Sequence, residues 1–202
     1  MILTQGLVEG PVLDCLFKFA SRPRPDDAVR ALGEAAVQDA ALAVAERMRQ
    51  LAKQDDEERL VLHKSLNNYR RFYVGGLGIG VVTTGNYKYP YDWWAFAASN
   101  SKSSKNACKF CAEMRIIRAA KEVPCACVGG LVVLGENQPD GRSGELRKTL
   151  DPCGNCRDMM RAPENLYLFR RRTLIMTAKP LSQVRYVESL PKMMEAHGET
   201  WP

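Results

Sequence analysis

The 202-residue sequence lacks an uninterrupted apolar stretch long enough to cross a bilayer, which takes about 20 residues. The nearest candidate, residues 123–135, is better interpreted as a buried strand. A secretory signal is also lacking, because polar and turn-forming residues at positions 9, 10, 11 and 14 interrupt the apolar N-terminus. We therefore expect a cytoplasmic protein with no membrane partner.

Internal repeats and low-complexity segments are absent as well. The length suits one domain with an appendage, and 46% hydrophobic with 26% charged residues is the composition of a folded globular protein. The net charge of +6 suits an anionic partner, but the basic residues are spread along the chain. The one tight cluster, Arg170–Arg172, lies between two apolar runs and is interpreted as a solvated hairpin turn.

The first part of the chain is predicted to be helical. Apolar residues recur every three or four positions over 27–53, which indicates an amphipathic helix. Polar residues 54–58 predict a bend, and a second helix is expected over 60–71. The predicted organisation is an N-terminal leader and helical extension (1–56), a main domain (57–194) and a C-terminal tail (195–202).

The rest of the chain alternates strands with helices, which predicts an α/β sandwich with a mixed or largely parallel sheet. Gly85-Asn86 is a turn signal between two strands, and Asp151-Pro152 is read as the N-cap and first-turn proline of a helix. The expected strands are 72–84, 93–99, 125–134, 165–169 and 173–179, the expected helices are 111–122 and 151–160, and 136–148 is an expected loop.

Seven cysteines, an odd number, in a reducing compartment favour metal ligands over disulfides. Two Cys-x-x-Cys pairs, Cys108/Cys111 and Cys153/Cys156, admit two kinds of zinc site. If all four sulfurs bind one ion, the site is closed and structural. If three bind, the fourth position stays open to water and the site can be catalytic.

Glu113 favours the open site, because a structural site has no use for it. It follows Cys111 by two residues at a predicted helix start, where both side chains can reach one ion. The run Pro152-Cys153-Gly154-Asn155-Cys156 opens another helix, and helix N-termini favour the thiolate form of cysteine. Together the two motifs match the signature of zinc deaminases, with Cys in place of His.

The predicted ligands of a Zn²⁺ cofactor are therefore Cys111, Cys153 and Cys156, and Glu113 is the predicted catalytic acid and base. The other cysteines near these motifs are interpreted as bystanders. Cys108 lies in the loop before the helix, and Cys125 and Cys127 alternate along a strand as small buried hydrophobes.

With these motifs the chain resembles the cytidine deaminase family, specifically its small three-cysteine type with blasticidin-S-deaminase-like relatives. Cys111-Ala112-Glu113 is similar to the first zinc motif and Pro152–Arg157 to the second. Phe72–Leu77 is similar to the strand-opening segment, and Val187–Pro191 to the closing segment. The resemblance covers about residues 60–194 and implies the family's three-layer α-β-α fold.

The resemblance also implies roles for individual residues. Phe72 packs against the pyrimidine, Asn100 binds a sugar hydroxyl, and Ala112 holds the substrate base through its backbone. Arg157 donates hydrogen bonds to the sulfurs and offsets the negative charge of three thiolates around Zn²⁺. A homo-oligomer, tetramer or dimer, is implied too.

Two departures from the family affect the substrate and the metal. Lys102 stands where nucleoside-specific members have a glutamate that hydrogen-bonds the ribose. We therefore expect Lys102 to contact a phosphate or carboxylate group of the ligand. Met114 stands where the small members have an arginine that neutralises the thiolates, and Arg115, one step away, is the candidate substitute.

The sequence thus predicts a deaminase of a small cytosine-containing nucleoside, nucleotide or nucleoside natural product. The alternative on the same core is a nucleic-acid cytosine deaminase or deaminase toxin, for which the aromatic hairpin over residues 87–94 is the candidate surface. We interpret that hairpin as packing or a subunit contact, so a nucleic-acid partner is not favoured. The third hypothesis is that the chain is a non-catalytic zinc-binding module with four cysteine ligands.

Overall fold

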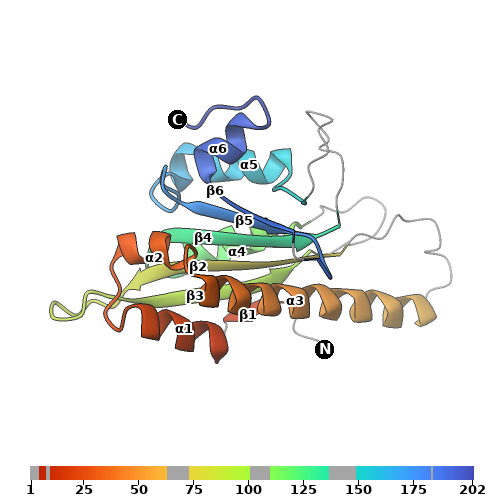
Figure 1. The fold of residues 1–202 in the computed structure, drawn as a ribbon, viewed down its shortest axis with the longest axis horizontal. Coiled ribbons are helices and arrows are strands. Elements are labelled where there is room, and N and C mark those ends of the chain that lie inside the picture. The colour runs from red at the N-terminus through yellow and green to blue at the C-terminus, as the bar shows by residue number, and fades with distance from the viewer. Residues whose placement is uncertain (1–4, 8–9, 63–72, 101–109, 137–148, 183) are drawn as a thin grey trace.

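The structure is a computed structural model, and it describes residues 5–7, 10–62, 73–100, 110–136, 149–182 and 184–202. A six-stranded sheet in the order β1-β3-β2-β4-β5-β6 forms its middle layer (Figure 1). In the described residues, six α-helices form the outer layers, three on each face of the sheet. The strands are β1 (Gln5–Leu7), β2 (Val74–Thr83), β3 (Tyr91–Ser99), β4 (Cys125–Gly135), β5 (Leu174–Ala178) and β6 (Arg185–Ser189).

The predicted α/β sandwich with a mixed sheet is confirmed. Only β4 and β5 pair in parallel, with Leu131 opposite Ile175, and the other four pairings are antiparallel. The alternative of a largely parallel sheet is wrong, because β2 and β3 form a hairpin around Gly85, whose φ of 73° suits glycine.

One face of the sheet is covered by α1 (Pro11–Phe19), α2 (Pro25–Ala31) and α3 (Ala35–Leu62). Figure 1 shows α3 crossing in front of the sheet. The two layers approach closely at Gly75, where a Cβ atom would lie 1.8 Å from the Ala45 carbonyl oxygen. The leader is therefore part of the core, with Val12 and Leu16 fully buried, and β1 pairs with β3 at the sheet edge.

Two predictions for this region are wrong. The helix expected over 27–53 is broken after Ala31, where the Gly33 amide bonds back to the Arg30 carbonyl at 2.8 Å. The bend expected over 54–58 is helical, because α3 continues to Leu62. The polar residues there are Gln54, two aspartates and two glutamates, and Gln and Glu are good helix formers, so a polar stretch alone does not end the helix.

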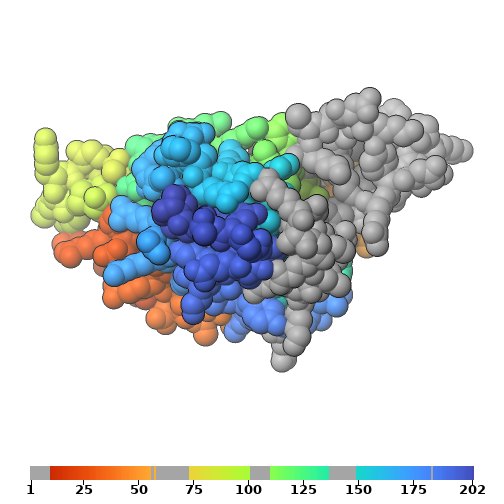
Figure 2. Space-filling model, turned by 90° about the horizontal axis from the view of Figure 1, so that it is seen from above, coloured from red at the N-terminus to blue at the C-terminus, as the bar shows by residue number. Residues whose placement is uncertain are grey.

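The opposite face carries α4 (Ala112–Glu122), α5 (Gly154–Arg161) and α6 (Leu190–Glu195). Ile116, Ile117 and Ala120 are fully buried, as their helical spacing predicts. Figure 2 shows α5 in cyan beside the C-terminal segment in dark blue on this side of the molecule. No helix in the described ranges combines the length and apolar character that a membrane span requires.

The strand expected over 165–169 is wrong. Residues 163–165 form a short 3₁₀ helix, and the amides of Leu168 and Phe169 bond back to the Asn165 carbonyl. The Asn165 side-chain amide donates to the Met159 carbonyl at 2.6 Å and holds this turn against α5. The basic cluster after it is a turn, closed by the Thr173 amide and the Arg170 carbonyl at 2.9 Å, but it does not join two strands.

Candidate metal centre

Three cysteine sulfurs meet where two helices begin. Cys111 directly precedes α4, Cys153 directly precedes α5, and Cys156 is the third residue of α5. Their sulfur atoms all lie within 4.8 Å of one another. The Sγ atoms of Cys111 and Cys153 are 3.6 Å apart, and those of Cys153 and Cys156 are 3.5 Å apart.

This spacing fits a tetrahedral zinc ion. With Zn–S bonds of about 2.3 Å, tetrahedral geometry places two sulfurs about 3.8 Å apart. The unpaired N–H groups of two helix N-termini also favour negative charge at this point. Within the ranges that the structure describes, no other group of three His, Cys, Asp or Glu side chains converges in this way.

The electrostatics of the three thiols show why a cation suits them. Hydrogen bonds from Cys111 and Cys156 lower the pKa of Cys153, and the backbone amides of Asn155 and Cys156 lower it further. In turn, the hydrogen bond with Cys153 raises the pKa of Cys111. The hydrogen bonds with Cys111 and Cys153 raise the pKa of Cys156. Three sulfurs this close together repel one another as thiolates, and a divalent cation supplies the counter-charge.

Glu113 lies against this cluster. It is the second residue of α4 and is 4% exposed. Burial raises the pKa of its carboxyl to about 8, with a further contribution from the charge of Cys153, while a hydrogen bond with Cys156 lowers it. The structure therefore brings together the four residues that the sequence singles out as ligands and acid–base group.

Helix α4 is placed over the start of β2. A Cβ atom added to Gly76 would meet the Ala112 Cβ at 3.2 Å, and one added to Gly78 would meet Ile116. The helix therefore follows β2 from its first residues onward, and Ala112 and Glu113 lie at the end of the sheet where β2 begins. Asn100 lies at the same end, because its amide nitrogen and side-chain oxygen both bond to the Val74 backbone, at 3.0 and 2.8 Å.

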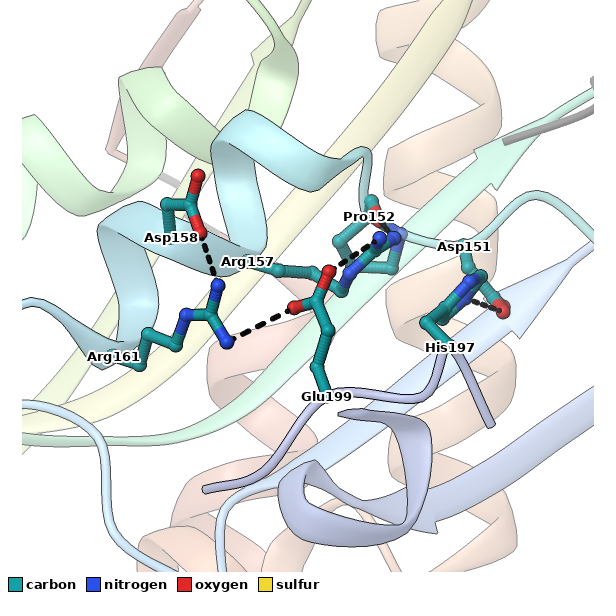
Figure 3. Close-up of polar contacts among 7 residues, drawn as sticks. All are labelled: Asp151, Pro152, Arg157, Asp158, Arg161, His197 and Glu199. Carbon is teal, nitrogen blue, oxygen red and sulfur yellow. Dashed lines mark hydrogen bonds and ion pairs between the residues drawn. The ribbon is translucent and has the colours of Figure 1, made fainter. Parts of the chain in front are cut away.

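Arg157 lies behind the second pair of ligands and is fully buried. Its guanidinium donates to the Pro152 carbonyl at 2.8 Å, next to Cys153, and to the Glu199 carboxylate at 2.9 Å. Figure 3 shows Glu199 between the guanidinium groups of Arg157 and Arg161. The Arg157 bonds to sulfur that the sequence predicts are not among these contacts, so its role toward the thiolates stays a prediction.

The C-terminal segment forms a second contact to the same loop. His197 Nε2 and the Asp151 carboxylate are 2.9 Å apart, and both side chains are almost fully buried (Figure 3). The prediction that Asp151 is the N-cap of α5 is therefore wrong. Cys153 occupies that position. Sequence reasoning missed His197 and Glu199, because nothing in a short tail 42 residues beyond Arg157 signals a contact with it.

The remaining predicted residues fall in two groups. Arg115 is in the first turn of α4, its amide bonds to the Cys111 carbonyl at 3.3 Å, and burial lowers the pKa of its guanidinium. Phe72, Lys102 and Cys108 lie outside the described residues.

No protein-family model matches the chain, and no curated protein matches it. Among solved structures, the chain is similar to a cytidine deaminase from Burkholderia pseudomallei, with 17% identity and a TM-score of 0.43 over 77% of this chain and 94% of that one. It is also similar to a cytidine deaminase from Mycobacterium leprae, with 16% identity and a TM-score of 0.37 over 76% of this chain and 96% of that one. The activity proposed below rests on the geometry of the three sulfurs and Glu113.

Proposed function

We propose that the chain is a zinc-dependent hydrolytic deaminase that converts a cytosine-containing nucleoside, nucleotide or nucleoside natural product to its uracil form and releases ammonia. The observation that carries this proposal is the convergence of three sulfurs, from two helix N-termini, on one buried glutamate. Three sulfur ligands leave one position of a tetrahedral ion open. A carboxyl beside that position is the proton carrier that hydrolysis of an amidine requires.

Cys111, Cys153 and Cys156 would hold the zinc ion, which when bound supplies a Lewis acid that polarises a water molecule. Glu113 accepts a proton from the attacking water and passes it to N3 of the ring. It then takes the second proton, from the new hydroxyl on C4, and gives it to the leaving amino group, which departs as ammonia. One water is consumed and one ammonia is released for each ring. Arg157 supports the ligands by holding the Pro152 carbonyl, directly before Cys153, while Glu199 counters its charge; hydrogen bonds from Arg157 to the thiolates remain part of the proposal.

The cytosine specificity of the proposal rests on the motifs Cys111-Ala112-Glu113 and Pro152–Arg157. Asn100 and Ala112 share the end of the sheet at which β2 begins, which supports a sugar contact for Asn100 and a base contact for Ala112. Phe72, Lys102 and a homo-oligomeric assembly remain part of the proposal on the same resemblance.

An ammonia-release screen tests the proposal. Zinc-loaded protein is incubated with cytidine, deoxycytidine, their phosphates and cytosine-containing natural products, and ammonia and the ultraviolet spectrum of the product are followed. We expect uracil-type product from at least one class, loss of activity after chelation, and recovery with zinc. Zinc-loaded protein that turns over none of them, and no oligonucleotide cytosine either, contradicts the proposal.

The competing function is a structural zinc module closed by Cys108. The burial of Glu113 beside the sulfurs favours the catalytic site, because a closed site would place an ionisable carboxyl in the interior without a use for it. Zinc content of Cys108→Ala separates the two. The catalytic site keeps one zinc ion per chain, whereas the structural site loses affinity for it.

A further inference from the structure

A cavity of about 480 Å³ lies at the far end of the sheet from the cysteine cluster. Three stretches distant in the sequence form it: residues 22–26, the tip of the β2–β3 hairpin, and Arg170. Figures 1 and 2 both show the hairpin tip protruding at one end of the molecule, next to the segment before α2. From Gly76, under α4, to Thr83, strand β2 spans roughly 23 Å. The cavity is therefore separate from the candidate metal centre.

The cavity gathers unneutralised positive charge. Arg22, Arg24, Lys88 and Arg170 line it and are exposed, and Asp26 is its one acidic residue. Within the described part of the chain, none of these four cations forms an ion pair with a carboxylate. The other nearby acid, Asp27, is engaged by the Arg24 amide at 2.9 Å and by the Arg30 guanidinium.

Aromatic rings lie among these cations. The Arg22 guanidinium stacks 4.5 Å from the centre of the Tyr89 ring, and Lys88 Nζ lies 5.5 Å from the same centre. Tyr87, at the hairpin tip, is fully exposed. The interpretation of the aromatic hairpin as packing therefore holds for Trp93 and Trp94, which are buried, but not for the two tyrosines.

The backbone around the cavity is held in place on both sides. The Trp93 indole N–H donates to the Ala20 carbonyl at 2.8 Å, just before the arginine segment. In the hairpin, the Asn86 side chain accepts bonds from the Lys88 and Tyr89 amides at 2.8 and 3.3 Å. The charged side chains are therefore carried on preorganised backbone, and binding a ligand would not require a loop to become ordered.

A second cavity, of about 530 Å³, adjoins the first and shares Arg24 and Asp26 with it. It adds Arg30 and Arg172, so the two cavities present six cations and two carboxylates along one surface. A single small anion would need one compact pocket. An extended track with exposed tyrosines suits a polymer, because every phosphate of the backbone can meet a cation and unpaired bases can stack on the rings.

We propose that this surface, from Lys88 and Arg22 through Arg24 to Arg172, binds the phosphate backbone of a single-stranded nucleic acid. The chemistry that recognises it is cationic, with the exposed ring of Tyr87 for an unpaired base. This site is independent of the proposed deaminase activity and would anchor a strand at a distance from the metal centre. A flat anionic membrane is disfavoured, because the cations line cavities and do not form a flat face.

The test is fluorescence anisotropy of labelled oligo-dT and oligo-rU strands of about 20 nucleotides with the zinc-loaded full chain. Titrations between about 50 and about 200 mM salt give affinity and salt dependence. The triple variant Arg24→Gln/Lys88→Gln/Arg170→Gln is compared with Arg47→Gln/Lys121→Gln/Lys192→Gln. The control removes the same charge from exposed positions outside the two cavities. Circular dichroism and zinc content show that both variants fold.

We expect the cavity variant to weaken binding about tenfold or more and to reduce the salt slope by about 2, which is about 0.7 for each of three lost phosphate contacts. The control is expected to change affinity by less than about twofold. Equal effects of the two variants would reduce the binding to net charge and overturn the proposal. So would equal affinity for a duplex, displacement of the strand by micromolar pyrophosphate, or tighter binding to anionic vesicles than to either strand.

Discussion

The guanidinium of Arg157 donates to the carboxylate of Glu199 at 2.9 Å across 42 residues of sequence. Arg157 is fully buried, and the Glu199 side chain is 11% exposed. The same guanidinium holds the Pro152 carbonyl, directly before Cys153. The last residues of the chain therefore support the turn that presents two of the three sulfurs, and they do so from outside the segment that resembles the family.

Glu199→Gln should lower the free energy of unfolding by about 3 kcal/mol, because it leaves a buried guanidinium without its counter-charge. The zinc dissociation constant, measured by chelator competition, should rise as well, because the Pro152–Cys156 turn is less firmly held. The matched control is Glu195→Gln, an exposed carboxylate nearby in the C-terminal region. Unchanged stability and zinc affinity in the Glu199 variant would show that the contact supports nothing.

Glu113→Gln should keep the fold and one zinc ion per chain while kcat falls by about 10²–10⁴-fold, because the amide cannot carry protons between water and the ring. Steady-state kinetics on the best substrate of the ammonia-release screen give kcat, and metal analysis gives the zinc content. A variant with normal turnover would remove Glu113 from the mechanism.

Zinc removal should unmask three thiols, those of Cys111, Cys153 and Cys156. We expect a thiol reagent at mildly alkaline pH to label Cys153 soon after chelation, because its pKa is lowered, and to label Cys111 and the fully buried Cys156 more slowly. Cys125 and Cys127 should stay slow in both states, because burial raises the pKa of these thiols to about 12 and about 11 and they are 6% and 0% exposed. Mass spectrometry assigns the labelled positions, and a fourth zinc-protected thiol at Cys108 would indicate the closed site.

Gly75→Ala should destabilise the fold by about 1–3 kcal/mol or more, because the new methyl group would overlap the Ala45 carbonyl of α3. Denaturant unfolding measures the change. Ala43→Ser, on the exposed side of the same helix, should stay within about 0.5 kcal/mol of the parent. A tolerated alanine at position 75 would mean that α3 can move away from β2 without loss.

Local patterns predicted the elements whose signal lies within one stretch of chain. The spacing of Ile116, Ile117 and Ala120 predicts α4, and Gly85-Asn86 predicts the hairpin turn. The patterns failed where a distant contact or backbone geometry decides, as in the residues around Asn165, which turn back onto α5 and do not extend. The break at Gly33 was missed for the same reason, because α2 and α3 share one apolar spacing, although α2 packs mainly on β4 and α3 mainly on β2.

The sequence by itself determined the chemistry of the candidate centre, because residue type and spacing decide which sulfurs and which carboxyl can reach one ion from the first turns of two helices. Only the tertiary structure decided what surrounds that centre, since Glu199, His197 and the cations of Arg22, Lys88 and Arg170 come together through the packing of segments far apart in the chain. Side-chain chemistry is local, whereas burial and charge convergence depend on how the layers of the sheet and helices stack.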